Sequence, residues 1–403
     1  MLTMKKSWKQ DKILVVVFLI LSLILYNIPT GFEERVDERA VRCRGKVLSV
    51  DNTEIRHLGL VKSGDQGVTL EIMDGPFKGR VMKGNNPLLG QMDRDKIFAP
   101  GDKALVVLSL DSEGKVVFVN PQEHYRIGLE LILLCLFGIA LALFGGWTGT
   151  KALLSFLFAA LMMWKILIPF LLKGHDPVLI SLGVVAILTA AIIFLVAGLT
   201  RKGVVAFLGA FLGVLTSCGL ALYFTRAFHV HGAVMPFAET LLYSGFDHLN
   251  ITKIYMAAVF LAASGAVMDL AMDVAASMDE VVSGRPDISM LEAVTSGLRV
   301  GRAVVGTMTT TLLLAYSGGY ITLLMAFMAQ GVPLANLFNL IYVAAEVLKT
   351  LVGSFGLVMV APFTAVMGGV VYTRRRAKDM PSENTPVSTS LKTRNIELQT
   401  DQS

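Results

Sequence analysis

Residues Val178–Leu199 read VLISLGVVAILTAAIIFLVAGL, a stretch without a single charged side chain. A helix needs about 20 mostly apolar residues to cross the hydrocarbon core of a bilayer, so this stretch predicts a membrane span. The whole chain has the same bias, because 54% of its 403 residues are hydrophobic and only 17% are charged. A typical soluble protein carries about 25% charged residues. An ordinary soluble enzyme and a disordered chain are both excluded.

Seven further apolar blocks predict an α-helical integral membrane bundle of about eight spans. These blocks are Ile13–Ile28, Ile127–Gly146, Ala152–Leu172, Gly203–Phe224, Ile254–Ala276, Ala303–Met328 and Leu337–Tyr372. The first block follows four lysines but lacks the small residues of a cleavage site, which favours an uncleaved anchor over a signal peptide. The last block would be about 54 Å long as one helix. We expect it to tilt, to break near Gly353, Gly356 or Pro362, or to begin as an interfacial helix.

The lysines and arginines of the short loops predict the orientation of the bundle. With the N-terminus inside, the cytoplasmic set is Lys5, Lys6, Lys9, Lys12, Lys151, Arg201, Lys202, Arg285, Arg299, Arg302, Arg374, Arg375, Arg376 and Lys378. The outer short loops hold only Lys173, Arg226 and Lys253. We therefore expect both termini in the cytoplasm and the protein in the cytoplasmic membrane of a bacterium. The net charge of +5 follows from this topology, and no nucleic-acid partner is expected.

Residues 30–126 differ in character and predict an extracytoplasmic β domain between the first two spans. Runs rich in β-branched residues alternate with glycine and aspartate turns, a pattern typical of strands and hairpins. The runs are Val41–Val50, Val68–Met73, Arg80–Lys83, Lys103–Leu110 and Lys115–Asn120. About five strands in this length predict a small closed or nearly closed barrel, similar to an OB fold. We expect Cys43 to be a free thiol and His57 to be a surface residue rather than a metal ligand.

These patterns divide the chain into four segments. Residues 1–29 are the cytoplasmic start and first span, 30–126 the β domain, 127–372 a seven-span membrane domain, and 373–403 a basic cytoplasmic tail. The tail is polar and rich in serine, threonine and proline, which predicts disorder. Neither a metal site nor a cofactor is expected.

Ionisable residues within the apolar blocks are the candidate functional residues, because charge inside a membrane is costly. Gly265, Asp269 and Asp273 recur every fourth residue and therefore share one helix face. Two carboxylates on one face repel each other, which favours binding of a proton or a cation. Two alternatives remain open: Asp273 marks the inner water boundary, and Asp269 pairs with a lysine.

Two further pairs of polar residues lie in the blocks that follow. Thr307 and Thr310 belong to a run of hydroxyls that either bond to their own helix carbonyls or face the aspartates as donors. Glu346 and Lys349 are three residues apart, so they either contribute to the same site or pair with each other. Asp269, Asp273, Thr307, Thr310, Glu346 and Lys349 form the predicted ion-binding or coupling set.

Several of these motifs together resemble the YibE/F-like family of bacterial membrane proteins. The matching segments are Gly265–Ser277, Ser296–Arg302, Gly306–Met308, Leu314–Gly318 and Glu346–Thr364, and the resemblance covers roughly residues 125–372. The chain departs from the family pattern at Thr310, where an asparagine is expected. The resemblance implies the architecture but no agreed biochemical function. The order of anchor, outer β domain and aspartate helix is also similar to SecF-type export subunits, as an analogy only.

The leading hypothesis is a permease or transport subunit in which Asp269 and Asp273 bind a proton or a cation. Its partners would be the lipid bilayer, an unknown small solute or ion, and either further copies of the chain or a partner membrane subunit. The alternative is a non-transporting scaffold or sensor whose outer β domain binds a partner. An enzyme is not expected, because neither a His-Glu-x-x-His helix nor a Gly-x-Ser-x-Gly elbow occurs.

Overall fold

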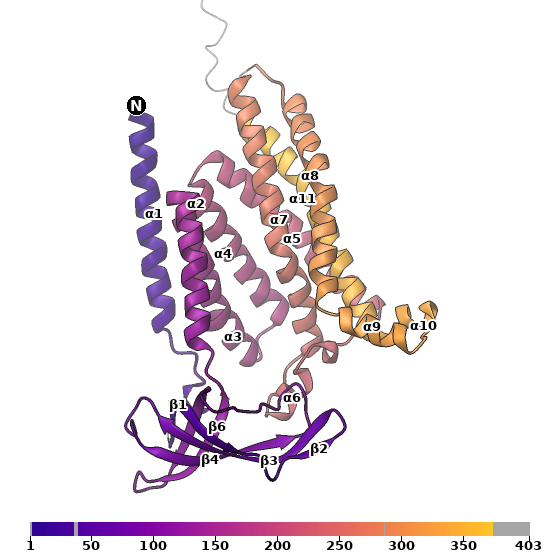
Figure 1. Cartoon of the computed structure of the whole chain (residues 1–403). Coiled ribbons are helices and arrows are strands. Elements are labelled where there is room, and N and C mark those ends of the chain that lie inside the picture. Colours follow the sequence, from indigo (N-terminus) through magenta and orange to yellow (C-terminus); the bar gives the residue numbers. More distant parts are fainter. Residues whose placement is uncertain (1, 36–38, 286, 374–403) are drawn as a thin grey trace, which may run out of the picture. The chain divides into compact units, whose positions relative to one another are not determined.

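The computed structural model describes residues 2–35, 39–285 and 287–373, and most of these residues are helical (Figure 1). They divide into two compact units, the first made of residues 1–198 and 225–261, the second of residues 199–224 and 262–403. Within the described residues, five helical runs are long and apolar enough to cross a membrane: Ile127–Leu172, Pro177–Ala197, Arg201–Ala227, Ile251–Gly284 and Ile341–Thr373. The tail beyond residue 373, for which the sequence predicts disorder, lies outside the described residues.

The β domain in the first unit is a six-stranded antiparallel sheet that curls into a half-barrel (Figure 1). Its strands are β1 (Ala40–Asp51), β2 (Arg56–Leu58), β3 (Val61–Ile72), β4 (Val81–Leu89), β5 (Lys103–Leu110) and β6 (Val116–His124), and a short 3₁₀ turn (Glu33–Arg35) precedes them. The order is β2-β3-β1-β5-β6, with β4 paired to β3. Five strands correspond to the predicted runs. β2 was not predicted, because its three exposed residues show no alternation of apolar and polar side chains.

Alternate residues of the long strands build the core of this domain. The buried set is Cys43, Val47, Val68, Leu70, Ile72, Phe98, Ala104, Val106, Leu108 and Val119. Two polar side chains of this domain, Gln66 and Asn86, are fully buried, and Gln66 is hydrogen-bonded through both its amide nitrogen and its oxygen. Its amide nitrogen donates to the Phe98 carbonyl at 2.9 Å, and its oxygen accepts from the Phe98 N–H at 3.0 Å and from Asn86 at 3.1 Å. Gln66 therefore ties β3 to β4 and to the loop that inserts Phe98.

Cys43 is a free thiol, as predicted, but it is only 4% exposed. Burial, with a smaller contribution from Asp74, raises the pKa of this thiol to about 11. The reactive thiolate is therefore scarce at neutral pH, and the side chain is also shielded from reagents. A probe of the position of this domain needs a different residue.

The helical run 127–172 consists of two antiparallel helices rather than one rod. It comprises α2 (Ile127–Met162), a π-helical turn (Met163–Leu167) and α3 (Ile168–Leu172). Gly146 has φ 53° and ψ −129°, and the rings of Phe137 and Phe156 lie 5.7 Å apart. A straight helix would separate these two residues by about 28 Å. The chain reverses at Gly146, so the predicted blocks 127–146 and 152–172 lie in separate helices.

Two lysines connect the second of these helices to α1 (Leu2–Asn27). Lys151 forms an ion pair of 3.4 Å with Asp11 near one end of α1, and Lys165 donates at 2.9 Å to the Ile28 carbonyl at the other end. The two helices therefore run parallel. A lysine at a helix C-terminus satisfies a carbonyl that has no partner within the helix. This contact explains how a lysine is accommodated in the apolar block 152–172.

The remaining helices of the first unit are α4 (Pro177–Ala197), α6 (Ala238–Tyr243) and the start of α7 (Ile251–Gly284), and a 3₁₀ turn (Gly232–Val234) precedes α6. Asp176 caps α4 by accepting hydrogen bonds from the N–H groups of Val178 and Leu179, and it pairs with Lys253 at 2.5 Å. The hydrogen bond from Lys253 lowers the pKa of Asp176. The capping carboxylate therefore stays charged at neutral pH.

In the second unit, glycines let the helices approach closely. It contains most of α5 (Arg201–Ala227), the rest of α7, α8 (Met290–Gly318) and α11 (Ile341–Thr373). A Cβ on Gly213 of α5 would lie 2.8 Å from Val267 of α7 and 3.0 Å from Val360 of α11. A Cβ on Gly301 of α8 would lie 2.6 Å from the Ala361 side chain of α11. Small residues in such contacts are the usual basis of helix packing in membranes.

The predicted span Ala303–Met328 is bent rather than straight. α8 begins at a capping box made by Ser289 and Glu292, ends at Gly318, and is followed by α9 (Ile321–Ala329) at an angle of 65°. The bend falls at the pair Gly318–Gly319, where the chain has no side chains to restrain it. If α8 and α9 count as one broken span, they add a sixth to the five apolar runs.

The last predicted block, Leu337–Tyr372, is also divided. It starts within α10 (Leu334–Asn339), breaks at Leu340, and continues as α11 without interruption through Gly353, Gly356 and Pro362. Of the three alternatives expected for this block, the structure shows the one in which it begins as a separate short helix. The alternative of a break near Gly353, Gly356 or Pro362 is wrong. Figure 1 shows α9 and α10 beyond the end of α8.

Two glycines of α8 provide a matched test of this packing. Gly301 touches Ala361, whereas Gly306 has no atom within 4 Å of its Cβ position. We predict that Gly301→Leu lowers the free energy of unfolding by about 1–3 kcal/mol, because an overpacked contact forces neighbouring atoms apart. Gly306→Leu should change it little. Thermal unfolding of the purified protein in detergent measures both, and equal losses would contradict the packing described.

Candidate functional site

Asp269 and Asp273 lie on the exposed face of α7, together with Gly265. The packed face is on the other side of the helix, where Val267 contacts Gly213 and Met278 contacts Gly297 of α8. At 3.6 residues per turn, Val267 and Met278 lie about 160° and 180° around the helix from Asp269. The shared face predicted from the spacing is confirmed, and it is the face that the second unit leaves uncovered.

Neither aspartate is neutralised by a neighbour within the described chain. No described residue forms an ion pair or a hydrogen bond with either carboxylate. The pairing of Asp269 with a lysine, one of the alternatives, is therefore not seen among the described residues. Lys165 in the apolar block 152–172 and Lys151 just before that block have their own partners, the Ile28 carbonyl and Asp11.

The two threonines are placed at the level of Asp269 but do not contact it. Val274 lies 3.8 Å from the Cβ position of Gly301, and α8 runs antiparallel to α7. Thr307 is about 9 Å further along α8, which corresponds to the height of Asp269. The Thr307 hydroxyl donates to the Val304 carbonyl at 2.9 Å and the Thr310 hydroxyl to the Gly306 carbonyl at 3.2 Å. Their donors are thus used within their own helix, which was one of the two alternatives.

Glu346 and Lys349 form the second ionisable group of this unit. Their side chains pair at 3.7 Å, and each is 29% exposed. The Lys349 ammonium also lies 5.1 Å from the ring centroid of Tyr316 on α8, a favourable cation–π distance. The structure therefore shows the pairing alternative, with an aromatic ring added that the sequence reasoning did not place there.

Tyr316 is the member of this group that was missed. Its hydroxyl is buried without a hydrogen-bond partner in the described residues, and it lies 3.6 Å from the Cβ position of Gly353. A signal was present in the sequence, since Glu346, Lys349 and Gly353 recur at helical spacing and Tyr316 belongs to Leu314–Gly318, one of the segments that resemble the family. What the sequence lacked was the register of α8 against α11.

The six predicted residues do not converge on one site. The Ala263 side chain of α7 lies 3.2 Å from the Cβ position of Gly353, and the Tyr372 hydroxyl of α11 donates to the Ala275 carbonyl at 2.9 Å. The two helices therefore run parallel. Measured along the helix axes from the contact between Ala263 and Gly353, Asp269 lies about 9 Å in one direction and Glu346 about 10 Å in the other. The aspartates and the Glu346–Lys349–Tyr316 group are two centres at different heights.

The side chains present do not form a preassembled metal centre in the described part of the chain. No group of three His, Cys, Asp or Glu residues there is close enough to hold a metal ion. Asp269 and Asp273 supply two carboxylates one helical turn apart. Such an arrangement can take up a proton or bind a weakly held monovalent cation together with water.

Residues 133–374, more than half of the chain, match the YibE/F-like protein family. The chain belongs to this family. The matched region begins within α2 and ends just past α11, so it includes the aspartates, the threonines and the Glu346–Lys349 pair and leaves out the β domain. No curated protein and no solved structure is significantly similar to the chain.

The Glu346–Lys349 pair can be tested by a double-mutant comparison. Lys349→Met leaves the Glu346 carboxylate uncompensated in an apolar helix, where a lone charge costs up to about 2.5–3.5 kcal/mol. We predict that this variant melts at a lower temperature than the native protein in detergent. Glu346→Gln combined with Lys349→Met should recover most of the loss, because no unpaired charge remains. A double variant as unstable as the single one would contradict the pairing.

Proposed function

We propose that this family member is a permease or transport subunit of the bacterial cytoplasmic membrane, in which Asp269 and Asp273 bind a proton or a cation. One observation supports this function above all: two carboxylates without partners lie on one face of an apolar helix. A packing role would be met at lower cost by alanine or leucine. Two such residues one turn apart therefore point to a requirement for charge.

The uncovered face of α7 cannot be left against lipid. A charged carboxylate needs water, a cation or a proton when it lies at membrane depth. A water-filled passage along Gly265, Asp269 and Asp273 would meet this need, and so would a second copy of the chain or a partner subunit. Along such a passage ions or protons reach the carboxylates from water, and Asp273, one turn nearer the cytoplasmic end, is the first that they meet from that side.

The proposed topology has eight spans with both termini in the cytoplasm and residues 30–126 outside. Its spans are α1, the two helices of run 127–172, α4, α5, α7, α8 and α11. The parallel course of α1 and of the helix after Gly146 supports this topology, because the helix 127–146, which lies between them in the chain, then runs in the opposite direction. The β domain consequently leaves and re-enters the helices at the same end, as a domain on one side of a membrane must.

The second candidate function is a scaffold or sensor without transport. It is favoured by the threonine hydroxyls bonded within α8 and by the closed Glu346–Lys349 pair, neither of which is free to take a ligand. The two functions differ in what they require of α7. A scaffold tolerates loss of the titratable groups, and a carrier does not.

We predict that Asp269→Asn leaves expression and membrane insertion intact but abolishes ion-coupled activity, because asparagine keeps the shape and loses the titratable group. Proteoliposomes with an internal pH-sensitive dye, challenged with a panel of ions and metabolites, measure transport. Infrared difference spectra during pH titration measure the protonated carboxyl directly. Asp287→Asn, in the exposed loop before α8, is the matched control and should behave as the native protein.

Native transport and an unchanged carboxyl band in Asp269→Asn would refute a coupling role and favour the scaffold. Loss of the band with transport retained would show that Asp269 titrates but does not couple. Either result is informative without knowledge of the natural substrate.

We predict that an impermeant thiol reagent labels Leu60→Cys on intact cells but leaves Cys43 unlabelled. Leu60 is 90% exposed, whereas the Cys43 thiol is buried and its pKa is raised to about 11. Both measurements use chains in which Cys135 and Cys218 are replaced by alanine. Cys43 should react after denaturation. Labelling of Leu60→Cys only after cell lysis would contradict an extracytoplasmic β domain.

A further inference from the structure

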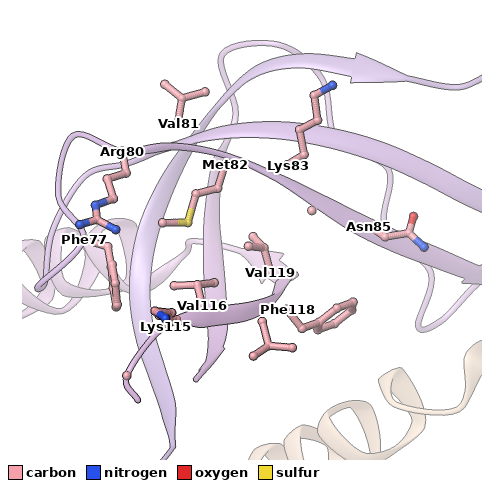
Figure 2. Close-up of a pocket in the computed structure, with 13 residues that line it drawn as sticks. Phe77, Arg80, Val81, Met82, Lys83, Asn85, Lys115, Val116, Phe118 and Val119 are labelled. Carbon is pink, nitrogen blue, oxygen red and sulfur yellow. The ribbon is translucent and has the colours of Figure 1, made fainter. Parts of the chain in front are cut away.

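A groove opens between β4 and β6, the two strands where the half-barrel fails to close (Figure 2). The strands come close where a Cβ on Gly84 would lie 2.7 Å from the Val119 carbonyl oxygen and 3.1 Å from the Pro121 side chain. From this contact the groove extends between Phe77 on the β4 side and Gly114 on the β6 side, and its volume is about 1030 Å³. Neither strand pairs with another described strand along this side.

The backbone of β4 presents free hydrogen-bonding groups to this groove. The Ile72 N–H donates to the Arg80 carbonyl at 2.9 Å, so Arg80 is a position that bonds to β3. Hydrogen bonding alternates along an antiparallel strand, and the N–H and C=O groups of Val81, Lys83 and Asn85 therefore point the other way. Such an edge is a template for pairing with another strand.

Prolines, which protect an edge by removing a hydrogen-bond donor, are confined to the other end of these strands. Pro87 on β4 and Pro121 on β6 each remove a donor. No proline occurs in residues 81–85 or 116–119, which flank the open part of the groove. This proline-free length of about five residues matches the short segments that add to sheet edges in peptide recognition.

The groove has an apolar floor. The side chains of Phe77, Met82 and Val116 are partly buried against the core of the domain and point into the space seen in Figure 2. Two apolar residues of β6 also remain open to solvent, Val117 at 71% and Phe118 at 49%. Alternate side chains of an added strand would cover this surface.

The charge of the groove is one-sided. Among the residues that line it, Arg80, Lys83 and Lys115 are cationic and none is acidic. The domain as a whole has nearly equal numbers of acidic and basic residues, so the cations are gathered here. Lys115 pairs with Glu113 at 2.7 Å, but both side chains are more than two-thirds exposed, and such pairs exchange readily for a better partner.

We propose that this groove binds an extended acidic peptide segment of a partner protein, which adds as a strand along β4 and β6. Backbone hydrogen bonds to Val81, Lys83 and Asn85 hold the segment, apolar side chains cover Phe77 and Met82, and acidic side chains meet Arg80 and Lys115. That the partner is extracytoplasmic rests on the topology proposed above. The binding itself does not depend on that topology or on transport.

Binding is tested with the purified full-length protein in detergent and a dye-labelled peptide, (Val-Glu)₃, followed by fluorescence anisotropy. We expect the peptide with lysine in place of glutamate, and the one with a central proline, to bind at least about tenfold more weakly. In the protein, Arg80→Glu with Lys115→Glu should weaken binding of the acidic peptide to a similar extent. The matched control is Lys62→Glu with Arg94→Glu, two exposed cations of the same domain outside the groove, which should change little.

Hydrogen–deuterium exchange locates the contact. The acidic peptide should slow exchange of the amides in residues 81–85 and 116–119, and not of those in β2. Equal binding of the acidic, basic and proline peptides, absence of saturable binding, or protection elsewhere would overturn the proposal. Protection of the same amides by nanodiscs of anionic lipid but not by the peptide would also overturn it, since the ligand would then be a lipid headgroup.

Discussion

The cost of a charge in hydrocarbon is the constraint on which this architecture depends. The chain meets it in two ways within the apolar blocks of the described residues. Lys165 reaches a helix-terminal carbonyl, and Glu346 and Lys349 neutralise each other beneath the Tyr316 ring. At the border of the blocks, Lys151 pairs with Asp11. Asp269 and Asp273 follow none of these patterns. Both lie well inside an apolar block, where a carboxylate without a partner is costly.

The helix that carries these carboxylates is divided by function around its circumference. One side is committed to packing, with Val267, Val274 and Met278 set against glycines of α5 and α8. These contacts are too close for larger residues, so they hold α7 at a fixed rotation. The aspartates are consequently held on the opposite side and cannot turn inward to find a partner in α8 or α11. The glycine packing and the exposure of the carboxylates are two results of the same rotation.

Periodicity predicted what depends on local spacing, and it failed where register between elements decides. The apolar blocks, five of six strands and the shared face of Asp269 and Asp273 follow from patterns of two to four residues. The break at Leu340 does not, because apolar residues continue across it and only packing shows where the helix ends. The bend after Gly318 has a local signal, the pair Gly318–Gly319, but the apolar pattern that continues beyond it concealed the bend. Tyr316 was missed for a similar reason, since its place beside Lys349 depends on how α8 slides along α11.

The open carboxylates and the open sheet edge lie in different units of the chain, and this separation has a consequence for function. Each is a set of groups left without a partner at an energetic cost, one in an apolar helix and one in a β domain. The family match includes the first and not the second. A function common to the family must therefore reside in residues 133–374, which include α7, and the proposed peptide groove between β4 and β6 would connect that function to a partner. Under the proposed coupling role, loss of the aspartates removes the activity itself, whereas loss of the groove changes only the partner to which the activity is connected.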